Sequence, residues 1–259
     1  MADKLWTKVR SDAELAIKSE PLLSILIQSA ILNHSSLQES LIYQIAKKLC
    51  STEVPYKIIY EVANEAFCVD PRLLQSVQAD LLAVFDRDPS CNSVVQPILY
   101  FKGFVAIQAY RVSHWLWSNN RYDFAYLIQS RSSEVFGIDI HPAAKIGNGL
   151  MIDHAHSIVI GETATVGNDV SMLHSVTLGG TGSRGLQRHP TIEDGVLLGA
   201  GAKVLGNITV GHCSKVASGS VVLKSVPPKK TVAGVPAKIV GEAGCAQPSI
   251  TMDQLIGNN

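Results

Sequence analysis

The sequence predicts an α+β protein in which an N-terminal α-helical domain is followed by a left-handed parallel β-helix with a protruding loop. Small or aliphatic residues recur at every sixth position in the second half of the chain, often directly before a glycine, whereas the first half has helical spacing. Side chains repeat every 3.6 residues in a helix and every two in a strand, so neither element explains a period of six. That period, with turn glycines beside it, is typical of hexapeptide β-helix repeats.

Residues 1–138 are expected to form the helical domain. Apolar residues with helical spacing follow Pro21, and a run with i, i+4 spacing follows the candidate caps Ser35 and Ser36. Stripes of this kind usually form a core or a subunit interface, so we assign them no catalytic role. The expected helical segments are 22–32, 37–49, 73–82 and 104–117.

The segment Asp86-Arg87-Asp88-Pro89 lies between two of these helical runs and has two interpretations. Aspartates next to a proline could form a turn that caps a helix. Alternatively, one of the two carboxylates belongs to a neighbouring site.

The β-helix is expected over residues 139–241, which leaves 242–259 as a C-terminal tail. Each six-residue repeat would form one face of a triangular prism, so about 18 residues complete a coil. Every sixth residue then points inwards and stacks on its counterpart in the next coil, about 4.8 Å away. The expected inward residues are Ile140, Ile146, Ile152, Ile158, Ala164, Val170 and Val176, then Ile192, Leu198, Val204, Val210, Val216 and Val222.

The period breaks between Val176 and Ile192. These residues are 16 positions apart where six are expected, so about ten residues, near 182–191, must loop out. Solenoids expel insertions onto one face, which is often the binding face. Because the loop carries Arg184 and the adjacent pair Arg188-His189, we expect it to bind a ligand; an ordinary surface loop is the alternative.

Composition excludes some classes of function. The 259 residues include 22 basic and 22 acidic ones, so no net positive charge indicates nucleic acid as a partner. No apolar segment of membrane-spanning length occurs, and residues 1–10 lack the apolar core of a signal peptide. The five cysteines are scattered without zinc-type spacing, which favours reduced thiols in a cytoplasmic protein.

Groups suited to proton transfer gather where the β-helix begins. Asp139 opens the first coil, and Asp153-His154 follows within about one coil. With about 18 residues in a coil, Asp139 and His154 would lie on stacked coils, a few ångströms apart. A carboxylate beside an imidazole fixes its tautomer and favours the imidazolium, so the pair could act as a general base.

Two other interpretations of His154 remain. It could be a solvated surface histidine. Alternatively, His154 could bind zinc together with His156 and His174, as histidines do on the β-helix of γ-class carbonic anhydrases. The histidine spacing does not match that family, so no metal is expected.

Several motifs resemble the serine O-acetyltransferase family. They are DRDP at 86–89, PILYFKGFVAIQAYRVSHWLW at 97–117, IHPAAKIG at 140–147, MIDHA at 151–155, IGETATVGNDV at 160–170, SVTLGGTG at 175–182, RHP at 188–190 and VAGVPAKIVG at 232–241. The hexapeptide elements are common to β-helical acyltransferases, whereas DRDP combined with IHPAAKIG, DHA and RHP is specific to the serine enzymes. The resemblance covers nearly the whole chain, to about residue 252.

The resemblance implies transfer of the acetyl group of acetyl-CoA to the L-serine hydroxyl, which is the first committed step of cysteine synthesis. It implies that His154 is the general base and that Asp139 orients it. A zwitterionic amino acid needs carboxylates at one end and a forked guanidinium at the other. The resemblance accordingly places Asp88 and Asp153 on the substrate ammonium, and Arg188 and His189 on its carboxylate.

Acetyl-CoA, by the same resemblance, lies along the β-helix. The backbone of Gly179 and Gly180 is expected near the thioester. The region of Ala200 and Lys215 is expected near the pantetheine and phosphates. The resemblance further implies feedback inhibition by L-cysteine, and homotrimers with sites between the β-helices that pair through the helical domains.

Three departures from the family pattern stand out. Gln187 replaces the usual Asp before RHP, which would loosen the positioning of Arg188, and His156 adds an imidazole beside the site. Many relatives end in an isoleucine that docks into O-acetylserine sulfhydrylase, whereas this chain ends Ile256-Gly257-Asn258-Asn259, so either the tail is truncated or this docking is weak or absent.

Two alternative functions stay open. One is another β-helical acetyltransferase that acts on a sugar or an amine, for which the zwitterion-binding residues Asp88, Asp153 and Arg188 would have no purpose. The other is a non-catalytic β-helical binding scaffold, which would not need Asp139 and His154.

Overall fold

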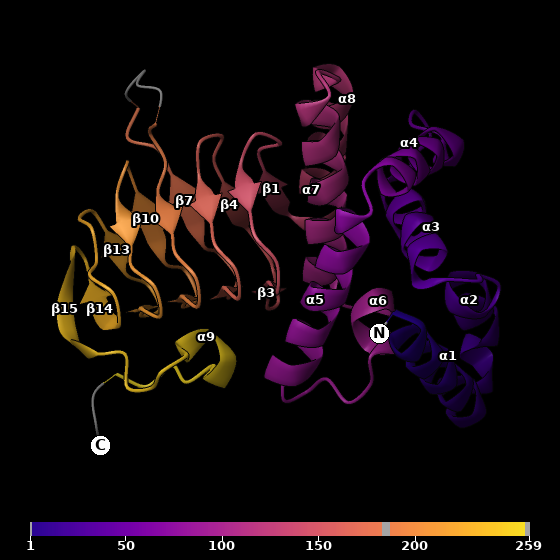
Figure 1. The fold of residues 1–259 in the computed structure, drawn as a ribbon, viewed down its shortest axis with the longest axis horizontal. Helices are drawn as coiled ribbons and strands as arrows, with labels where there is room; N and C mark the ends of the chain where they lie inside the picture. Colours follow the sequence, from indigo (N-terminus) through magenta and orange to yellow (C-terminus); the bar gives the residue numbers. More distant parts are fainter. Residues whose placement is uncertain (1, 183–186, 257–259) are drawn as a thin grey trace.

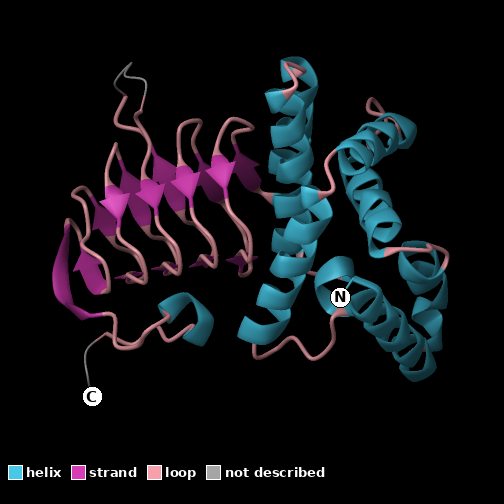
Figure 2. Ribbon diagram, viewed as in Figure 1, coloured by secondary structure: helices cyan, strands magenta, loops and turns pink. Residues whose placement is uncertain are grey.

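The computed structural model describes residues 2–182 and 187–256, so Arg184 of the expected loop and Gly257–Asn259 lie outside the described residues. The helical domain forms one half of the molecule and the β-helix the other (Figures 1 and 2). Within the helical domain, α5, α7 and α8 lie next to the β-helix, and α1 to α4 lie on their far side. The helical elements are α1 (Ala2–Ser19), η1 (Pro21–Leu23), α2 (Ser24–Ile27), η2 (Gln28–Leu32), α3 (Leu37–Leu49), α4 (Tyr56–Val69), α5 (Arg72–Arg87), α6 (Val95–Leu99), α7 (Lys102–Ser118), α8 (Tyr122–Phe136) and α9 (Pro248–Thr251).

The structure contains most of the expected helical segments. α3 begins after Ser36, whose Oγ accepts a hydrogen bond from the backbone N of Glu39 at 3.2 Å, as expected of an N-cap. α5 and α7 contain the two later segments. Residues 22–32 are different, because they divide into 3₁₀, α-helical and π-helical turns instead of one helix.

Fifteen strands follow among the described residues: β1 (Ile138–Ile140), β2 (Lys145–Ile146), β3 (Met151–Ile152), β4 (Ile158–Ile160), β5 (Thr165–Val166), β6 (Ser171–Met172), β7 (Thr177–Gly179), β8 (Thr191–Ile192), β9 (Leu197–Leu198), β10 (Lys203–Leu205), β11 (Thr209–Val210), β12 (Lys215–Val216), β13 (Val221–Val222), β14 (Lys230–Gly234) and β15 (Ala237–Glu242). They form three sheets, in the orders β1-β4-β7-β10-β13, β11-β8-β5-β2 and β15-β14-β12-β9-β6-β3. Pairing is parallel except for β14 with β15. Each sheet is therefore one face of the solenoid, and the antiparallel hairpin lies at its end.

The six-residue period predicts burial correctly except at Ile146, which is half-buried, but it predicts stacking only in part. Ile140 pairs with Ile160 and not with Ile158, because the first coil spans 20 residues (138 to 158 in the pairing of β1 with β4). Later coils have 18, as between Lys203 and Val221. The two additional residues lie in the corner 153–157, where His154, Ala155 and Ser157 all have positive φ (54°, 58° and 57°). This corner carries the expected catalytic histidine.

The expected loop leaves the solenoid between β7 and β8. Leu178 pairs with Val204, 26 positions further on, so the insertion adds eight residues to an 18-residue coil. The expected ten residues is therefore an overestimate. That number was counted from Val176, whereas the paired strand residue on the face before Ile192 is Leu178.

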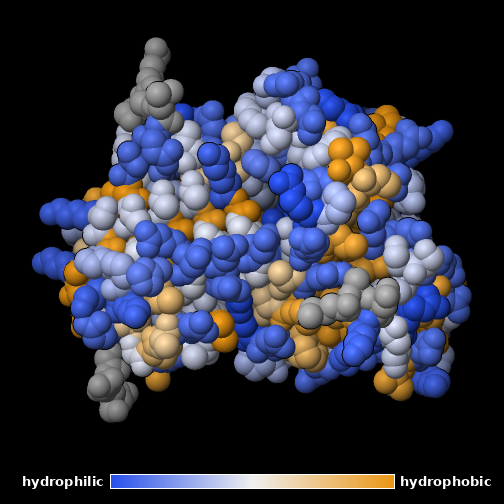
Figure 3. Space-filling view, in the orientation of Figure 1, coloured by the Kyte–Doolittle hydropathy of each residue, from blue (hydrophilic) through white to orange (hydrophobic). Residues whose placement is uncertain are grey.

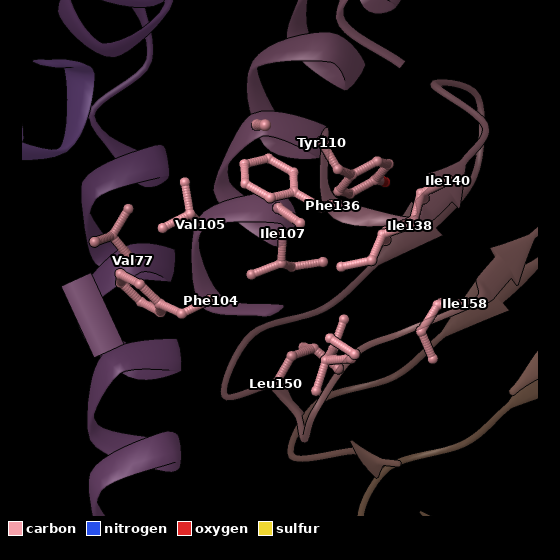
Figure 4. Close-up of a cluster of buried hydrophobic side chains, with 14 of the residues drawn as sticks. Val77, Phe104, Val105, Ile107, Tyr110, Phe136, Ile138, Ile140, Leu150 and Ile158 are labelled. Carbon is pink, nitrogen blue, oxygen red and sulfur yellow. The ribbon is translucent and has the colours of Figure 1, made fainter. Parts of the chain in front are cut away.

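The core is continuous from the helices into the first coil (Figure 4). Phe104 and Ile107 of α7 lie in the same buried cluster as Ile138 and Leu150 of the solenoid. Such burial stabilises by about 25 cal/mol per Å² of apolar surface removed from water. The helical domain is therefore packed directly against the first coil of the solenoid and is not merely connected to it by a linker.

A buried ion pair joins the same two parts. Asp80 of α5 is fully buried, and its Oδ2 accepts hydrogen bonds from Nε (3.1 Å) and Nη2 (2.7 Å) of Arg111 and from Nε2 of Gln108 (2.9 Å). Its Oδ1 accepts the backbone N–H of Leu150 at 2.9 Å, while Arg111 donates to the carbonyl of Gly147 at 2.8 Å. These bonds fix α5 and α7 relative to the first coil.

The surface seen in Figure 3 is mainly polar, with apolar patches over the helical half and along the β-helix. Among the described residues, no helix combines the length and the apolarity needed to cross a bilayer.

Candidate active site

A cavity of about 670 Å³ opens where α5 and α7 meet the corner 153–157. Its polar lining includes Asp88, Lys102, Asp153 and His154. Its apolar lining is contributed by Val84, Phe101, Phe104, Met151 and Ile152, among others. The structure thus brings together three of the expected site residues that the sequence separates widely.

Asp88 reaches the cavity from the C-terminal end of α5. Its Oδ1 accepts hydrogen bonds from the N (2.8 Å) and Oγ (2.7 Å) of Ser90, which leaves Oδ2 available. The preceding Arg87 is buried and donates to Ser171 Oγ (3.1 Å) and Asp169 Oδ1 (2.9 Å) on the second coil. Asp88 therefore closes a turn after α5 and also lines a cavity, and its role in a site stays a prediction.

Asp153 and His154 extend from β3 into the enlarged corner. The backbone N of Asp153 still bonds to Met172 of the next coil at 2.9 Å, and its carboxylate Oδ2 lies 3.7 Å from Nε2 of His154. The His154 side chain is 73% exposed in the single chain. A residue other than glycine with positive φ costs about 1–2 kcal/mol, and such strain is frequent at functional sites. The two extra residues of the corner thus project the imidazole outwards.

The neighbouring histidines make different contacts. His154 packs edge-on against His174 of the next coil, with ring centroids 5.8 Å apart, and Nδ1 of His174 is buried without a hydrogen-bond partner among the described residues. His156 instead contacts Nζ of Lys102 at 3.0 Å. The three imidazoles considered for zinc do not converge, and no group of three potential metal ligands occurs within residues 2–182 and 187–256.

Asp139 lies elsewhere, contrary to the expected stacking. Its partner in the next coil is Val159, and its Oδ1 accepts a hydrogen bond from Nε2 of Gln129 at 2.6 Å. It lines a separate hollow of about 520 Å³ with residues of α8, including Gln129 and Tyr126. The expected contact within one chain assumed an 18-residue coil, and the 20-residue coil places β4, not the His154 corner, beside Asp139.

Arg188 and His189 form a second polar cluster, at the point where the inserted loop rejoins the solenoid. Arg188 forms an ion pair with Glu162, which lowers the pKa of that carboxyl. His189 Nδ1 accepts a hydrogen bond from the backbone N of Thr163 at 3.2 Å, so Nε2 carries the proton of the neutral ring. Burial lowers the pKa of His189, and Arg188 lowers it further. His189 is therefore a neutral donor at neutral pH.

His141 connects this cluster with Asp139. Burial lowers its pKa, whereas Glu162 and Asp139 act in the opposite direction, so both carboxylates lie within electrostatic range of its ring. Its imidazole packs against Trp117 (5.2 Å between centroids) and Tyr126 (5.7 Å). Asp139, Arg188 and His189 hence belong to one region of the solenoid, which we call the arginine half. Asp88, Asp153 and His154 form the base half.

Gln187, the residue that departs from the family pattern, holds the loop in place. Its Nε2 donates to the carbonyls of Thr163 (2.7 Å) and His189 (2.8 Å). The bond to Thr163 joins the returning segment to the second coil, and the bond to His189 closes a local turn. The expected loosening of Arg188 is not supported by these contacts.

The expected acetyl-CoA residues lie on two faces. Gly179 ends β7 and is followed by the exposed Gly180, whereas Ala200 follows β9 and Lys215 begins β12 on another sheet. The tail covers Lys215, whose Nζ donates to the carbonyls of Asp253 (3.2 Å) and Leu255 (2.7 Å). Within one chain, the four residues therefore lie on or next to two different sheets of the solenoid.

Sequence reasoning assigned no role to Lys102, Glu162 or Gln129. Lys102 and Glu162 lie within motifs that carry the family resemblance. Because Arg188 is a cation, an acidic residue in those motifs, such as Glu162, was a possible partner for it. Gln129 lies in a helix with no comparable signal, and only packing reveals its contact with Asp139.

Comparison with known proteins gives a consistent result. Residues 5–109 match the family model described as serine acetyltransferase, N-terminal, and residues 189–224 match that of the bacterial transferase hexapeptide (six repeats). The serine acetyltransferase of Escherichia coli (strain K12) is 49% identical over 250 residues, which cover 96% of this chain and 92% of that protein.

Two solved structures share the fold over almost their full length. A serine acetyltransferase in complex with cysteine superposes with a TM-score of 0.96 at 44% identity, covering 99% of this chain and 100% of that one. The Brucella abortus strain S19 serine acetyltransferase in complex with coenzyme A gives 0.91 at 50% identity, covering 94% and 97%. Sequence identity and shared fold together show that this chain is an acyltransferase and belongs to the serine acetyltransferase family.

Proposed function

We propose that this protein transfers the acetyl group of acetyl-CoA to the hydroxyl of L-serine, giving O-acetyl-L-serine and CoA, in the first step of cysteine biosynthesis. The observation that carries the proposal is the convergence of Asp88, Asp153 and His154 on one cavity. Two carboxylates suit the ammonium of an amino acid, and the imidazole suits its hydroxyl. Coenzyme A bound to the Brucella abortus relative supports acetyl-CoA as the donor.

The complete site is formed between two copies of the chain. The base half lacks a cation for the substrate carboxylate apart from Lys102, and the arginine half lies on another part of the solenoid. A contact between unlike surfaces closes into a ring when repeated, so a cyclic trimer would form three such sites. In that assembly, Asp139 of one copy lies beside His154 of the next and restores the expected carboxylate–imidazole pair.

An exposed apolar patch supports a further contact through the helices. Leu22 and Ile25 are 91% and 84% exposed, and Leu15 and Leu26 are exposed beside them. Exposed apolar patches of this kind commonly mark protein interfaces. Two trimers joined through this patch would form a dimer of trimers.

Direct attack accounts for the chemistry. His154 takes the proton of the serine hydroxyl as the oxygen attacks the thioester carbonyl, and the same proton then leaves with the CoA sulfur. Asp139 of the neighbouring copy stabilises the intervening imidazolium. The thioester is already activated, so no enzyme nucleophile is required, and no cysteine is among the residues that line the cavity.

Acetyl-CoA would run from Gly179 and Gly180 towards Ala200 and Lys215. The exposed backbone of Gly180 lets a thioester approach closely, and the ammonium of Lys215 suits phosphate. Nζ of Lys215 donates hydrogen bonds to the carbonyls of Asp253 and Leu255 in the C-terminal tail. The phosphates of CoA can therefore reach Lys215 only if the tail moves aside.

L-cysteine differs from L-serine only by sulfur in place of oxygen, so the residues that hold one zwitterion hold the other. We therefore propose competitive feedback inhibition by L-cysteine, which the cysteine complex of a relative supports. The five cysteines are free thiols, which suits action in the reducing cytoplasm.

The test is CoA release when the protein is mixed with acetyl-CoA and L-serine, compared with sugars and other amines. His154→Ala should lower kcat by about 10²–10⁴-fold while acetyl-CoA still binds, because only the base is lost. Turnover of a sugar in preference to L-serine would indicate another β-helical acetyltransferase. Binding of acetyl-CoA without any turnover would indicate a scaffold.

A further inference from the structure

His156 makes a contact that the catalytic scheme does not use. It lies two residues after His154 on the enlarged corner, and its Nδ1 is 3.0 Å from Nζ of Lys102. An ammonium carries only donors, so Nδ1 must accept this bond and the ring proton lies on Nε2. The ring also lies over Gly137 at the end of α8, where an added Cβ would be 3.5 Å from Nδ1. The imidazole thus sits between the start of α7 and the end of α8.

Among the described residues that line the cavity, Lys102 is the one lysine or arginine, and Asp88 and Asp153 are the two carboxylates. It lines the cavity together with Asp88 and Asp153, yet among the described residues it forms no ion pair within 4.0 Å with either carboxylate. Its four-carbon stem is flexible and its ammonium is a compact charge, so the side chain could swing towards them. Such a movement would neutralise the carboxylates that receive the substrate ammonium, since both ammonium groups present the same charge and the same donors.

We propose that His156 is a positioning residue that keeps Lys102 away from Asp88 and Asp153 and thereby preserves the affinity for the amino acid. The inference rests on the proposed function, because it assigns the substrate ammonium to these carboxylates. With the acceptor in place, Nζ stays within 3.0 Å of Nδ1 of His156 on the corner 153–157. Without the acceptor, Lys102 competes with the substrate for the same two groups.

Three variants of the full chain test the inference by steady-state kinetics and by calorimetry with L-serine. His156→Leu keeps the side-chain volume but removes the acceptor, and should raise the L-serine KM by about fivefold with kcat within about twofold, as expected for one partly exposed ion pair. His156→Asn replaces the acceptor Nδ1 by the acceptor Oδ1, so this variant should keep the wild-type L-serine KM. The double variant His156→Leu/Lys102→Met should also return KM towards wild type, because the competing cation is gone.

The double variant separates positioning from simple support of the corner. If His156 only braced the corner, kcat would fall in His156→Leu, and removal of Lys102 would not reverse the loss. An unchanged KM in His156→Leu, or a raised KM that Lys102→Met fails to lower, would overturn the inference. Asp153→Asn serves as the reference: if it leaves the affinity for L-serine in calorimetry unchanged, the proposed ammonium site itself is wrong, whatever the His156 variants show.

Discussion

The proposed division of the site between two copies of the chain predicts complementation between inactive variants. Asp153→Asn damages the base half of every chain, and Arg188→Ala damages the arginine half. Each variant alone should be nearly inactive, because every site between copies then contains one damaged half. Coexpression of the two in equal amounts should form mixed rings by random assembly.

The magnitude follows from the geometry. A site in a mixed ring is intact when its base half comes from the Arg188→Ala chain and its arginine half from the Asp153→Asn chain. Each condition is met with a chance of one half, so about a quarter of the sites should be intact. The expected kcat per chain is therefore about 25% of wild type at saturating L-serine and acetyl-CoA, measured as CoA release.

A matched pair provides the control. Asp88→Asn and Asp153→Asn both lie in the base half, so their coexpression should restore nothing. Asp139→Asn should complement Asp153→Asn, because Asp139 belongs to the arginine half. Failure of Asp153→Asn with Arg188→Ala to complement in rings shown to be mixed would refute the shared site, and so would recovery in the control pair.

Three further predictions concern the support of the site. Asp80→Ala should lower the free energy of unfolding in urea by about 3–5 kcal/mol, because it leaves the buried Arg111 charge unpaired. The double variant Asp80→Leu/Arg111→Met, which replaces both charges with apolar side chains, should lose less stability than Asp80→Ala. Equal losses in the two variants would contradict this account. Gly103→Ala should lower the free energy of unfolding in urea by about 1–3 kcal/mol and raise the L-serine KM. The added Cβ would lie 2.2 Å from the carbonyl oxygen of Ile152 and force α7 away from the cavity. An unchanged free energy of unfolding and an unchanged KM would argue against this packing. Burial lowers the pKa of His141, so near this pKa the native state binds fewer protons than the unfolded state. The contribution of the neutral His141 to stability is therefore complete above about pH 6.5 and is lost as the pH falls through the lower native pKa. Urea titrations of His141→Gln should show a smaller loss of stability below pH 6.5 than wild type, and an equal loss would refute this account.

Periodicity was sufficient to predict the architecture. A period of six leaves apolar residues such as Val204 and Val222 on one side of every repeat, and only a solenoid buries all of them by stacking coil on coil. The cap at Ser36 and the adjacency of Asp153 and His154 are likewise local features, so sequence reasoning identified them. The residues proposed for each half of the site came from their motifs, and their roles stay predictions.

Their grouping was decided by the tertiary structure. A repeat pattern distinguishes inward from outward positions, but it does not count the residues in a corner. The corner 153–157 is two residues longer than in later coils, three of its residues adopt positive φ, and it separates His154 from Asp139 within one chain. Asp88 meets Asp153 only because the buried pair Asp80–Arg111 fixes α5 and α7 against the first coil. Contacts between distant elements depend on such packing, which no local pattern encodes.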